Sequence, residues 1–267
     1  MLAVVTQLSY QRAVEQVRAR LLAAADRLWF NMGSYRDADI DRMVSLIVPH
    51  VRAGQIQVAN LTEAYFAQVG SRAGIDVRYV TGGRGVPADA VYRRPATTVY
   101  TALSDDKPMA LAVTEGAHRL GSLIATDLQM AKVRQAQRSL DSAGITAFIR
   151  VLTGRENCAL CVIASTQRYH VKDLSPIHPG CDCSVDVLPR GFDPAEQVIN
   201  PELLELTHKV IEQKLGASDR GARELGLGKP VSDYTSLIVT REHGEYGPTL
   251  SWLDDKFTSA ADIPALH

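Results

Sequence analysis

The chain has 267 residues, of which 46% are hydrophobic and 22% are charged, and its formal net charge is −1. These values are typical of an ordinary globular protein of one or two domains. They exclude a general electrostatic attraction to nucleic acid or acidic membranes, although a local basic patch is compatible with them. No run of about 18 apolar residues occurs, so no membrane span is expected.

The N-terminal segment is not expected to be a secretory signal, because it lacks a basic start and its apolar stretch is soon interrupted by Gln, Arg and Glu. We therefore expect the protein to be made in a reducing cytosol, where disulfides are rare. Clustered cysteines in that compartment more often bind metal or take part in chemistry.

Apolar residues recur at three- and four-residue spacing through residues 1–75, which predicts amphipathic helices with short connections. The first helix is expected to begin after Ser9 and the second near Asp37 or Asp39. Gly54 is expected to separate the second helix from a third.

Two segments of contrasting character follow. Residues 76–96 are rich in glycine and proline and are predicted to form a connecting loop. Its run Gly82-Gly83-Arg84-Gly85 offers a place for a phosphate but lacks the Lys-Ser/Thr pair of a Walker loop. A long helix is then predicted from about Lys107 to Ser142, spanning roughly 50 Å at 1.5 Å per residue.

Strand signals frame the cysteines. Residues 145–152 are rich in β-branched and aromatic side chains, and residues 183–188 alternate with the period of a strand. After Pro189, a helix is expected from Pro201 to about Leu215. Short strand-like pieces follow at 237–239 and 249–252, around a turn that is expected to form a hairpin.

The predicted fold class is therefore α+β. A mainly α-helical domain with one long helix is expected over residues 1–144. A small strand-framed zinc-binding module is expected over 145–190, and a helix with an irregular, partly extended C-terminal tail over 191–267.

The cysteines form the pattern Cys158-x-x-Cys161, nineteen intervening residues and Cys181-x-Cys183. Two close pairs can place four sulfur atoms around one tetrahedral zinc ion with bonds of about 2.3 Å. His178 provides a second ligand set, in which it replaces one cysteine. The sequence thus predicts a structural zinc site, whose metal supplies folding energy to a module too small for its own core.

The four cysteines could also form disulfides, a catalytic zinc site or a redox pair, and each of these has its own requirement. Two disulfides need an oxidising compartment. A catalytic zinc keeps an open position beside an acid or base, and Glu156, Asp173 and Asp182 are near in sequence, but the fourth sulfur favours a structural site. A redox Cys-x-x-Cys pair is expected within a thioredoxin-like βαβ pattern, which this sequence does not predict.

Residues 150–161 (RVLTGRENCALC) and 177–183 (IHPGCDC) carry a resemblance. They resemble the C-terminal signature of the Mu-F-like minor head proteins of tailed bacteriophages, a Cys-x-x-Cys followed by His-Pro-x-Cys-x-Cys. That family also has long helices upstream of the cysteines. The heptad 242–248 is similar to the tails of such proteins in phages of actinobacteria.

The resemblance implies a minor capsid protein of phage head morphogenesis, located in the virion at the portal vertex or capsid interior. It implies action in head assembly and in DNA packaging or ejection. The portal protein and the major capsid protein are the implied partners, with several copies around the portal and non-specific contact with packaged DNA.

Two alternatives belong to other classes. A capsid maturation protease is the first, since related phage proteins carry that label. The chain has neither a Gly-x-Ser-x-Gly elbow nor a His-Glu-x-x-His motif, so a non-enzymatic role is favoured. The pair His118 and Ser122 is interpreted as a polar helix face, and the polar cluster at 242–245 as part of a turn.

A zinc-knuckle adaptor for nucleic acid is the second alternative. Between the cysteine pairs, only Arg168, Lys172 and Tyr169 offer charge or stacking, which is little for this role. More positive charge lies at Arg93-Arg94 and on the long-helix face with Lys132, Arg134 and Arg138. We expect any DNA contact there to be without sequence readout.

Overall fold

The computed structural model describes residues 6–82, 84–152, 159–174, 183–188, 191–192, 198–206, 209, 238–243 and 247–252. The chain divides into two compact units, residues 1–143 and 144–267. The long helices belong to the first unit and all the described strands to the second, so the fold class is α+β. Among the described helices, none has the length and apolar character needed to cross a membrane.

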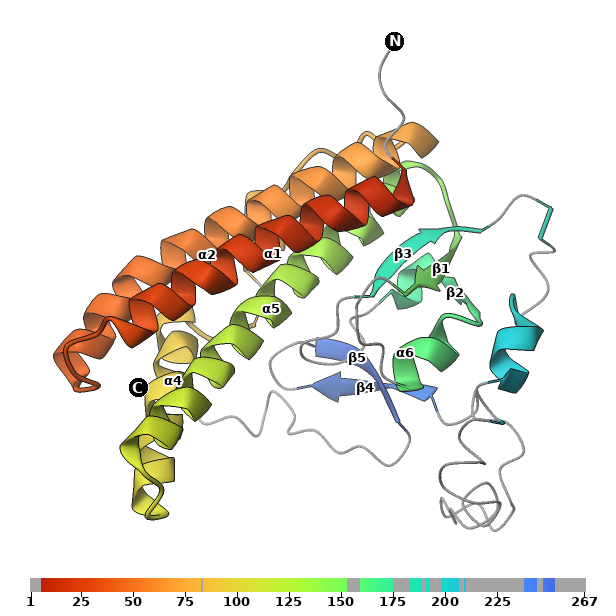
Figure 1. The fold of residues 1–267 in the computed structure, drawn as a ribbon. Helices are drawn as coiled ribbons and strands as arrows, with labels where there is room; N and C mark the ends of the chain where they lie inside the picture. The colour runs from red at the N-terminus through yellow and green to blue at the C-terminus, as the bar shows by residue number, and fades with distance from the viewer. Residues whose placement is uncertain are drawn as a thin grey trace. The chain divides into compact units, whose positions relative to one another are not determined.

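The first unit is a bundle of helices (Figure 1). Its elements are α1 (Gln7–Phe30), α2 (Asp37–Phe66), the short 3-10 turn η1 (Ala67–Val69), α3 (Val77–Thr81), α4 (Ala88–Ser104) and α5 (Met109–Ser142). Helices α1, α2 and α5 lie side by side along much of their lengths in Figure 1. The predicted long helix is confirmed as α5, which begins directly after Pro108.

The core of this unit lies between α1, α2, α4 and α5. Trp29, Ile47, Val99 and Ile124 are completely buried there. The indole Nε1 of Trp29 also donates a hydrogen bond to the carbonyl of Val113 at 2.9 Å. Burying one large apolar side chain contributes about 1.5–3 kcal/mol, so a core of this extent can hold the bundle together.

Gly54 does not end a helix, and the prediction of a break there is wrong. The glycine is buried within the continuous helix α2. A Cβ atom at this position would approach Leu21 Cδ2 at 3.0 Å and Leu128 Cδ2 at 3.1 Å. The residue is therefore a point of close packing between α2, α1 and α5, and burial outweighs its weak helix propensity.

The prediction of a loop over residues 76–96 is also wrong for most of that segment. The Asp76 side chain caps α3 by accepting a hydrogen bond from the Tyr79 amide at 3.1 Å. Helix α4 includes Pro95, which is itself buried. Val91 and Val99 bury the same face of α4, and this burial outweighs the hydrogen bond that proline cannot donate.

The second unit contains a three-stranded antiparallel sheet in the order β2-β1-β3. Its elements are β1 (Ala147–Val151), α6 (Ala159–Ala164), β2 (Arg168–His170), the 3-10 turn η2 (Val171–Asp173) and β3 (Ser184–Val187). The two predicted strands are confirmed, and they pair with each other so that Arg150 lies opposite Val185. Neither α6 nor β2 was predicted.

The C-terminal part of this unit begins with a helical segment over residues 201–206, where the predicted helix starts. Asn200 caps it, because its Oδ1 accepts a hydrogen bond from the Leu203 amide at 2.9 Å. The remainder of the predicted helix lies largely outside the described residues. Strands β4 (Ile238–His243) and β5 (Gly247–Trp252) form the expected antiparallel hairpin.

Candidate metal centre

Two of the five predicted ligands are described, and they lie in the same buried cluster. Helix α6 carries Cys161, which is 4% exposed, and Cys183 directly precedes β3 and is 2% exposed. Both carry thiol groups. They share the cluster with Leu160, Ala164 and Leu250. One cysteine from each half of the motif is therefore brought into the same small core.

The other three predicted ligands, Cys158, His178 and Cys181, lie outside the described residues. Within the residues that the structure does describe, no group of three or more His, Cys, Asp or Glu side chains is arranged to hold a metal ion. The described geometry thus contains two thiols of the predicted site, and the identity of its remaining ligands stays a prediction.

Arg150 is the neighbour of this cluster that the sequence interpretation missed. Its side chain is buried, with 2% of the residue exposed. Its Nη1 donates to Cys183 Sγ at 3.8 Å. A single arginine in an apolar strand is the only sequence signal for this contact, and such a residue is usually interpreted as facing solvent.

The guanidinium of Arg150 lies beside two aromatic rings. Its central carbon lies 5.8 Å from the ring centroid of Phe148 and 5.3 Å from that of Tyr169. The two rings stack on each other with centroids 5.4 Å apart. Phe148 and Arg150 share a face of β1 because side chains two residues apart in a strand point the same way. The face therefore presents a cation packed beside two stacked rings.

The pKa of the Tyr169 hydroxyl is affected by Arg150 and by the two cysteines. Burial raises the pKa of its hydroxyl to about 12, the positive charge of Arg150 lowers it, and the sulfur atoms of Cys183 and Cys161 raise it further. Both thiols therefore act on the same buried phenol. Tyr169, Arg150 and the two cysteines form a single electrostatic environment.

A guanidinium keeps its charge at every pH that a protein tolerates. A hydrogen bond between a charged donor and a charged acceptor is roughly twice as strong as one between neutral groups. The contact between Arg150 and Cys183 is therefore strongest when the sulfur is a thiolate, the form in which cysteine binds metal. The two described thiols and the buried cation beside them have the chemistry that a thiolate–metal centre requires.

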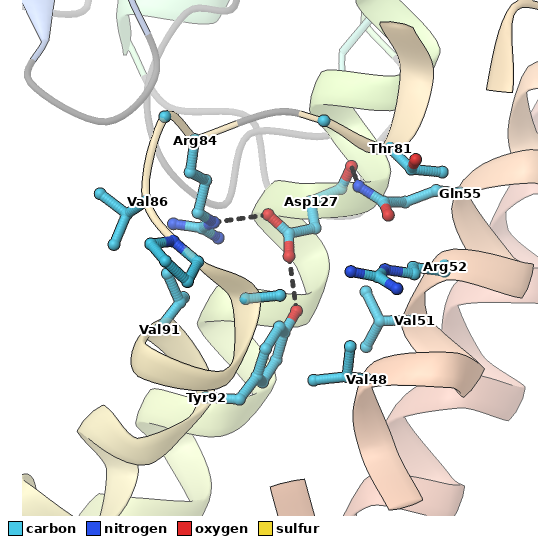
Figure 2. Close-up of a pocket in the computed structure, with 14 residues that line it drawn as sticks. Val48, Val51, Arg52, Gln55, Thr81, Arg84, Val86, Val91, Tyr92 and Asp127 are labelled. Atoms are coloured by element: carbon cyan, nitrogen blue, oxygen red, sulfur yellow. Dashed lines mark hydrogen bonds and ion pairs between the residues drawn. The ribbon is translucent and has the colours of Figure 1, made fainter. Parts of the chain in front are cut away.

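A second candidate site is a cavity of about 370 Å³ in the first unit, bordered by α2, the segment 81–88, α4 and α5. Figure 2 shows Arg84 and Tyr92 both directed at the Asp127 carboxylate. The Nε of Arg84 lies 2.6 Å from Asp127 Oδ1, and the Tyr92 hydroxyl donates to Oδ2 at 2.6 Å. Arg84 Nη2 also donates to the Leu123 carbonyl at 2.9 Å.

These buried groups bind one another, so their evident role is structural. Arg84 belongs to the glycine run that offered a place for a phosphate, but its guanidinium faces Asp127 instead. The interaction fixes the connection between α3 and α4 onto α5. Arg52 also lines the cavity and is exposed.

The predicted basic surfaces divide in a similar way. Arg93 forms an ion pair with Asp41. Lys132 is buried. Arg134 and Arg138 are half-buried and place their guanidinium carbons 5.6 and 5.8 Å from the ring centroid of Tyr79.

The residues weighed for a protease do not form a catalytic pair in the described structure. His118 and Ser122 are exposed on α5, and no hydrogen bond between them is found in this described helix. The backbone at 242–243 belongs to β4, whereas the side chains of Glu242 and His243, and all of Glu245, lie outside what is described.

Comparisons with known proteins leave the chain unassigned: it matches no protein-family model, no curated protein and no solved structure.

Proposed function

We propose that this chain is a non-enzymatic minor capsid protein of a tailed bacteriophage, with a zinc ion stapling its second unit. The observation that carries the proposal is the burial of Cys161 and Cys183 in one cluster. They come from the two halves of the motif that resembles the Mu-F-like signature, and a structural metal site requires these halves to meet.

Cys158, Cys161, Cys181 and Cys183 would hold the zinc, or His178 would replace one of the four. When bound, the ion supplies folding energy by joining distant segments of the chain. The segment between the cysteine pairs includes β2, which pairs with β1. A staple at its ends would keep α6 and β2 attached to the sheet.

The helical unit would then provide the surface that docks onto the portal protein or the major capsid protein. A rigid bundle with a long helix suits a part that several copies use around a portal. The protein would reside at the portal vertex or in the capsid interior and act in head assembly and in DNA packaging or ejection.

The metal is tested by elemental mass spectrometry of the full chain purified without chelator, together with a thiol titration. We expect about one zinc per chain and thiols that become reactive only after a chelator is added. A metal-free protein with freely reactive thiols would overturn the staple.

The capsid role is tested by co-expression with the portal and major capsid proteins of the same phage. We expect stoichiometric co-purification with the portal and intact capsid chains. Cleavage of the capsid chain that a single Ser or His substitution abolishes would instead support the maturation protease. Failure to co-purify with either protein would contradict the docking role.

Contact with packaged DNA is favoured by the cluster of Tyr79, Arg134 and Arg138. Arg134 Nη1 donates to the Tyr79 carbonyl at 3.1 Å, and Arg138 Nη2 donates to the Ala73 carbonyl at 3.3 Å. These two carbonyls orient the guanidinium groups beside the ring of Tyr79. Tyr79 is 41% exposed beside them, so this cluster combines cations with an aromatic ring, as nucleic-acid surfaces do.

The DNA contact is measured by fluorescence anisotropy with double-stranded DNA of arbitrary sequence over a range of salt concentrations. Losing two phosphate contacts in the double variant Arg134→Gln/Arg138→Gln should reduce the salt slope by about 2. The matched control is Arg12→Gln/Arg20→Gln, which removes the same charge from exposed positions on α1. An equal loss in both variants would contradict a contact at this cluster.

A further inference from the structure

Arg150 is a fully buried cation in contact with a proposed metal ligand. Only 2% of the residue is exposed, and its Nη1 lies 3.8 Å from Cys183 Sγ. The register of β1 and β3 accounts for this position, because Val151 pairs with Ser184, the residue that follows Cys183. The sheet itself therefore brings the arginine to the sulfur.

The rings beside Arg150 limit where its guanidinium can lie. Phe148 and Tyr169 stack on each other, and the guanidinium lies within 5.8 Å of both ring centroids. Cations are attracted to aromatic faces, and the attraction strengthens when water is excluded. The guanidinium is thus positioned by its surroundings before any metal binds.

The proposed zinc site carries a net negative charge, which the nearby guanidinium of Arg150 can offset. A zinc dication with four thiolates carries a net charge of −2, and a site with three thiolates and one histidine carries −1. Burying such a charge is costly unless an opposite charge lies close by. One buried guanidinium reduces the net charge of either ligand set by one.

We propose that Arg150 is a positioning residue of the zinc site, which orients the sulfur of Cys183 and offsets part of the negative charge of the thiolates. The inference rests on the zinc staple proposed above. It assigns to β1 a function beyond forming the sheet, since this strand supplies the neighbour that stabilises the metal-bound state of the cysteines.

The experiment uses the full-length chain with competing chromophoric chelators to measure zinc affinity, and cobalt substitution to count thiolate ligands from the absorption spectrum. Arg150→Met removes the charge while keeping an apolar stem, Arg150→Gln keeps an N–H donor without charge, and Arg150→Lys keeps the charge. Arg168→Met on the neighbouring strand β2 is the matched control, because that side chain bonds to His170.

We expect Arg150→Met to weaken zinc binding roughly tenfold to a hundredfold, as the loss of a neighbour to a metal ligand usually does. The cobalt spectrum should keep its thiolate bands, since the ligands themselves remain. Arg150→Lys should recover most of the lost affinity, Arg150→Gln should recover less, and Arg168→Met should bind like the original chain.

Equal zinc affinity in Arg150→Met and the original chain would overturn the inference and leave the staple intact. If Arg150→Met does not fold, the Lys and Gln variants decide, and equal affinity for these two would overturn the role of charge. If the original chain takes up neither zinc nor cobalt, the staple fails and the role of Arg150 fails with it.

Discussion

Among the residues that the structure describes, 21 buried side chains from four helices form one core cluster in the first unit, whereas five form the cluster around Cys161 and Cys183 in the second. The larger core joins helices through large buried side chains such as Trp29, Tyr92 and Leu120. Arg150 is buried beside the smaller cluster and contacts Cys183. The described core cluster of the first unit therefore consists of hydrophobic side chains, whereas the described cluster of the second has a buried cation beside its thiols.

This difference is the physical reason for proposing a metal in the second unit. Small cores seldom supply enough free energy to fold without disulfides, metals or partners. Under the proposal, zinc would add stability to the second unit, whereas the first would rely on its larger described core. Predictions that separate the two units test this difference directly.

The largest effect is expected for Cys183→Ser, which would remove a proposed zinc ligand and cost several kcal/mol of local stability. Hydrogen exchange should show faster opening of β1 and β3, with unchanged protection in α2 and α5. Leu250→Ala, in the same cluster, serves as a control that loses packing without a thiol. Unchanged protection in β1 and β3 of the Cys183→Ser protein would contradict the comparison.

In the first unit, the largest effect of a polar change is expected at Asp127. Asp127→Ala would leave the buried guanidinium of Arg84 without its carboxylate, and breaking a buried ion pair costs about 3–5 kcal/mol. Chemical denaturation monitored by circular dichroism measures the loss. The control Glu115→Ala breaks the partly exposed pair with Lys107 and should cost far less, because water screens the two charges. Equal losses of stability in the two variants would show that burial does not make the Arg84–Asp127 ion pair more important than the exposed one.

A smaller effect is expected from Gly116→Ala, which tests how tightly the helical core is packed. A Cβ atom there would lie 2.4 Å from Trp29 Cζ2 and 2.7 Å from Val99 Cγ2. Such overpacking usually costs about 1–3 kcal/mol. The control Gly121→Ala meets only Leu22 Cδ2 at 3.6 Å, so its better helix propensity should stabilise the unit by up to about 1 kcal/mol. Thermal unfolding distinguishes the two signs.

These positions also show what a sequence can predict. Local periodicity predicted helix α5 and strand β3, and β-branched and aromatic residues predicted strand β1, all three near their observed bounds. Gly54 and Pro95 misled the interpretation because their local preference is overruled by packing against distant helices. Periodicity contains no information about which helix will pack against a glycine.

The candidate site was predicted only as far as the cysteine motif extends. Spacing indicated that Cys161 and Cys183 would come together, and the structure places both in one cluster. Arg150 lies 33 residues from Cys183 in the chain, and no local pattern connects the two. The cavity at Asp127 was missed for the same reason, since Arg84 is 43 residues away.

The smallest change in stability is expected for Tyr169→Phe in the second unit. Its sign should be opposite to that of Tyr10→Phe in the first unit. The Tyr169 hydroxyl is buried and has no hydrogen-bond partner among the described residues. Removing it should therefore be neutral or stabilise the sheet by up to about 1 kcal/mol, because an unsatisfied polar group is costly to bury. Tyr10→Phe in the helical unit is the matched opposite, since that buried hydroxyl bonds to Thr62 Oγ1 at 2.9 Å, and its loss should cost about 1 kcal/mol.

The same substitution has a pH signature. Because the pKa of Tyr169 is raised to about 12 in the folded chain from its ordinary value of 10.0, the unfolded state loses this proton first as pH rises. The folded state binds more protons between these values, so the stability of the second unit should fall as pH increases from about 10 to about 12. Tyr169→Phe should remove that part of the slope, which hydrogen exchange of β1 between pH 9 and pH 11 can follow after correction for the intrinsic rate. An unchanged slope would mean that the phenol ionises in the folded sheet as readily as in water, and that the environment shared with Arg150 and the two thiols is not closed to solvent.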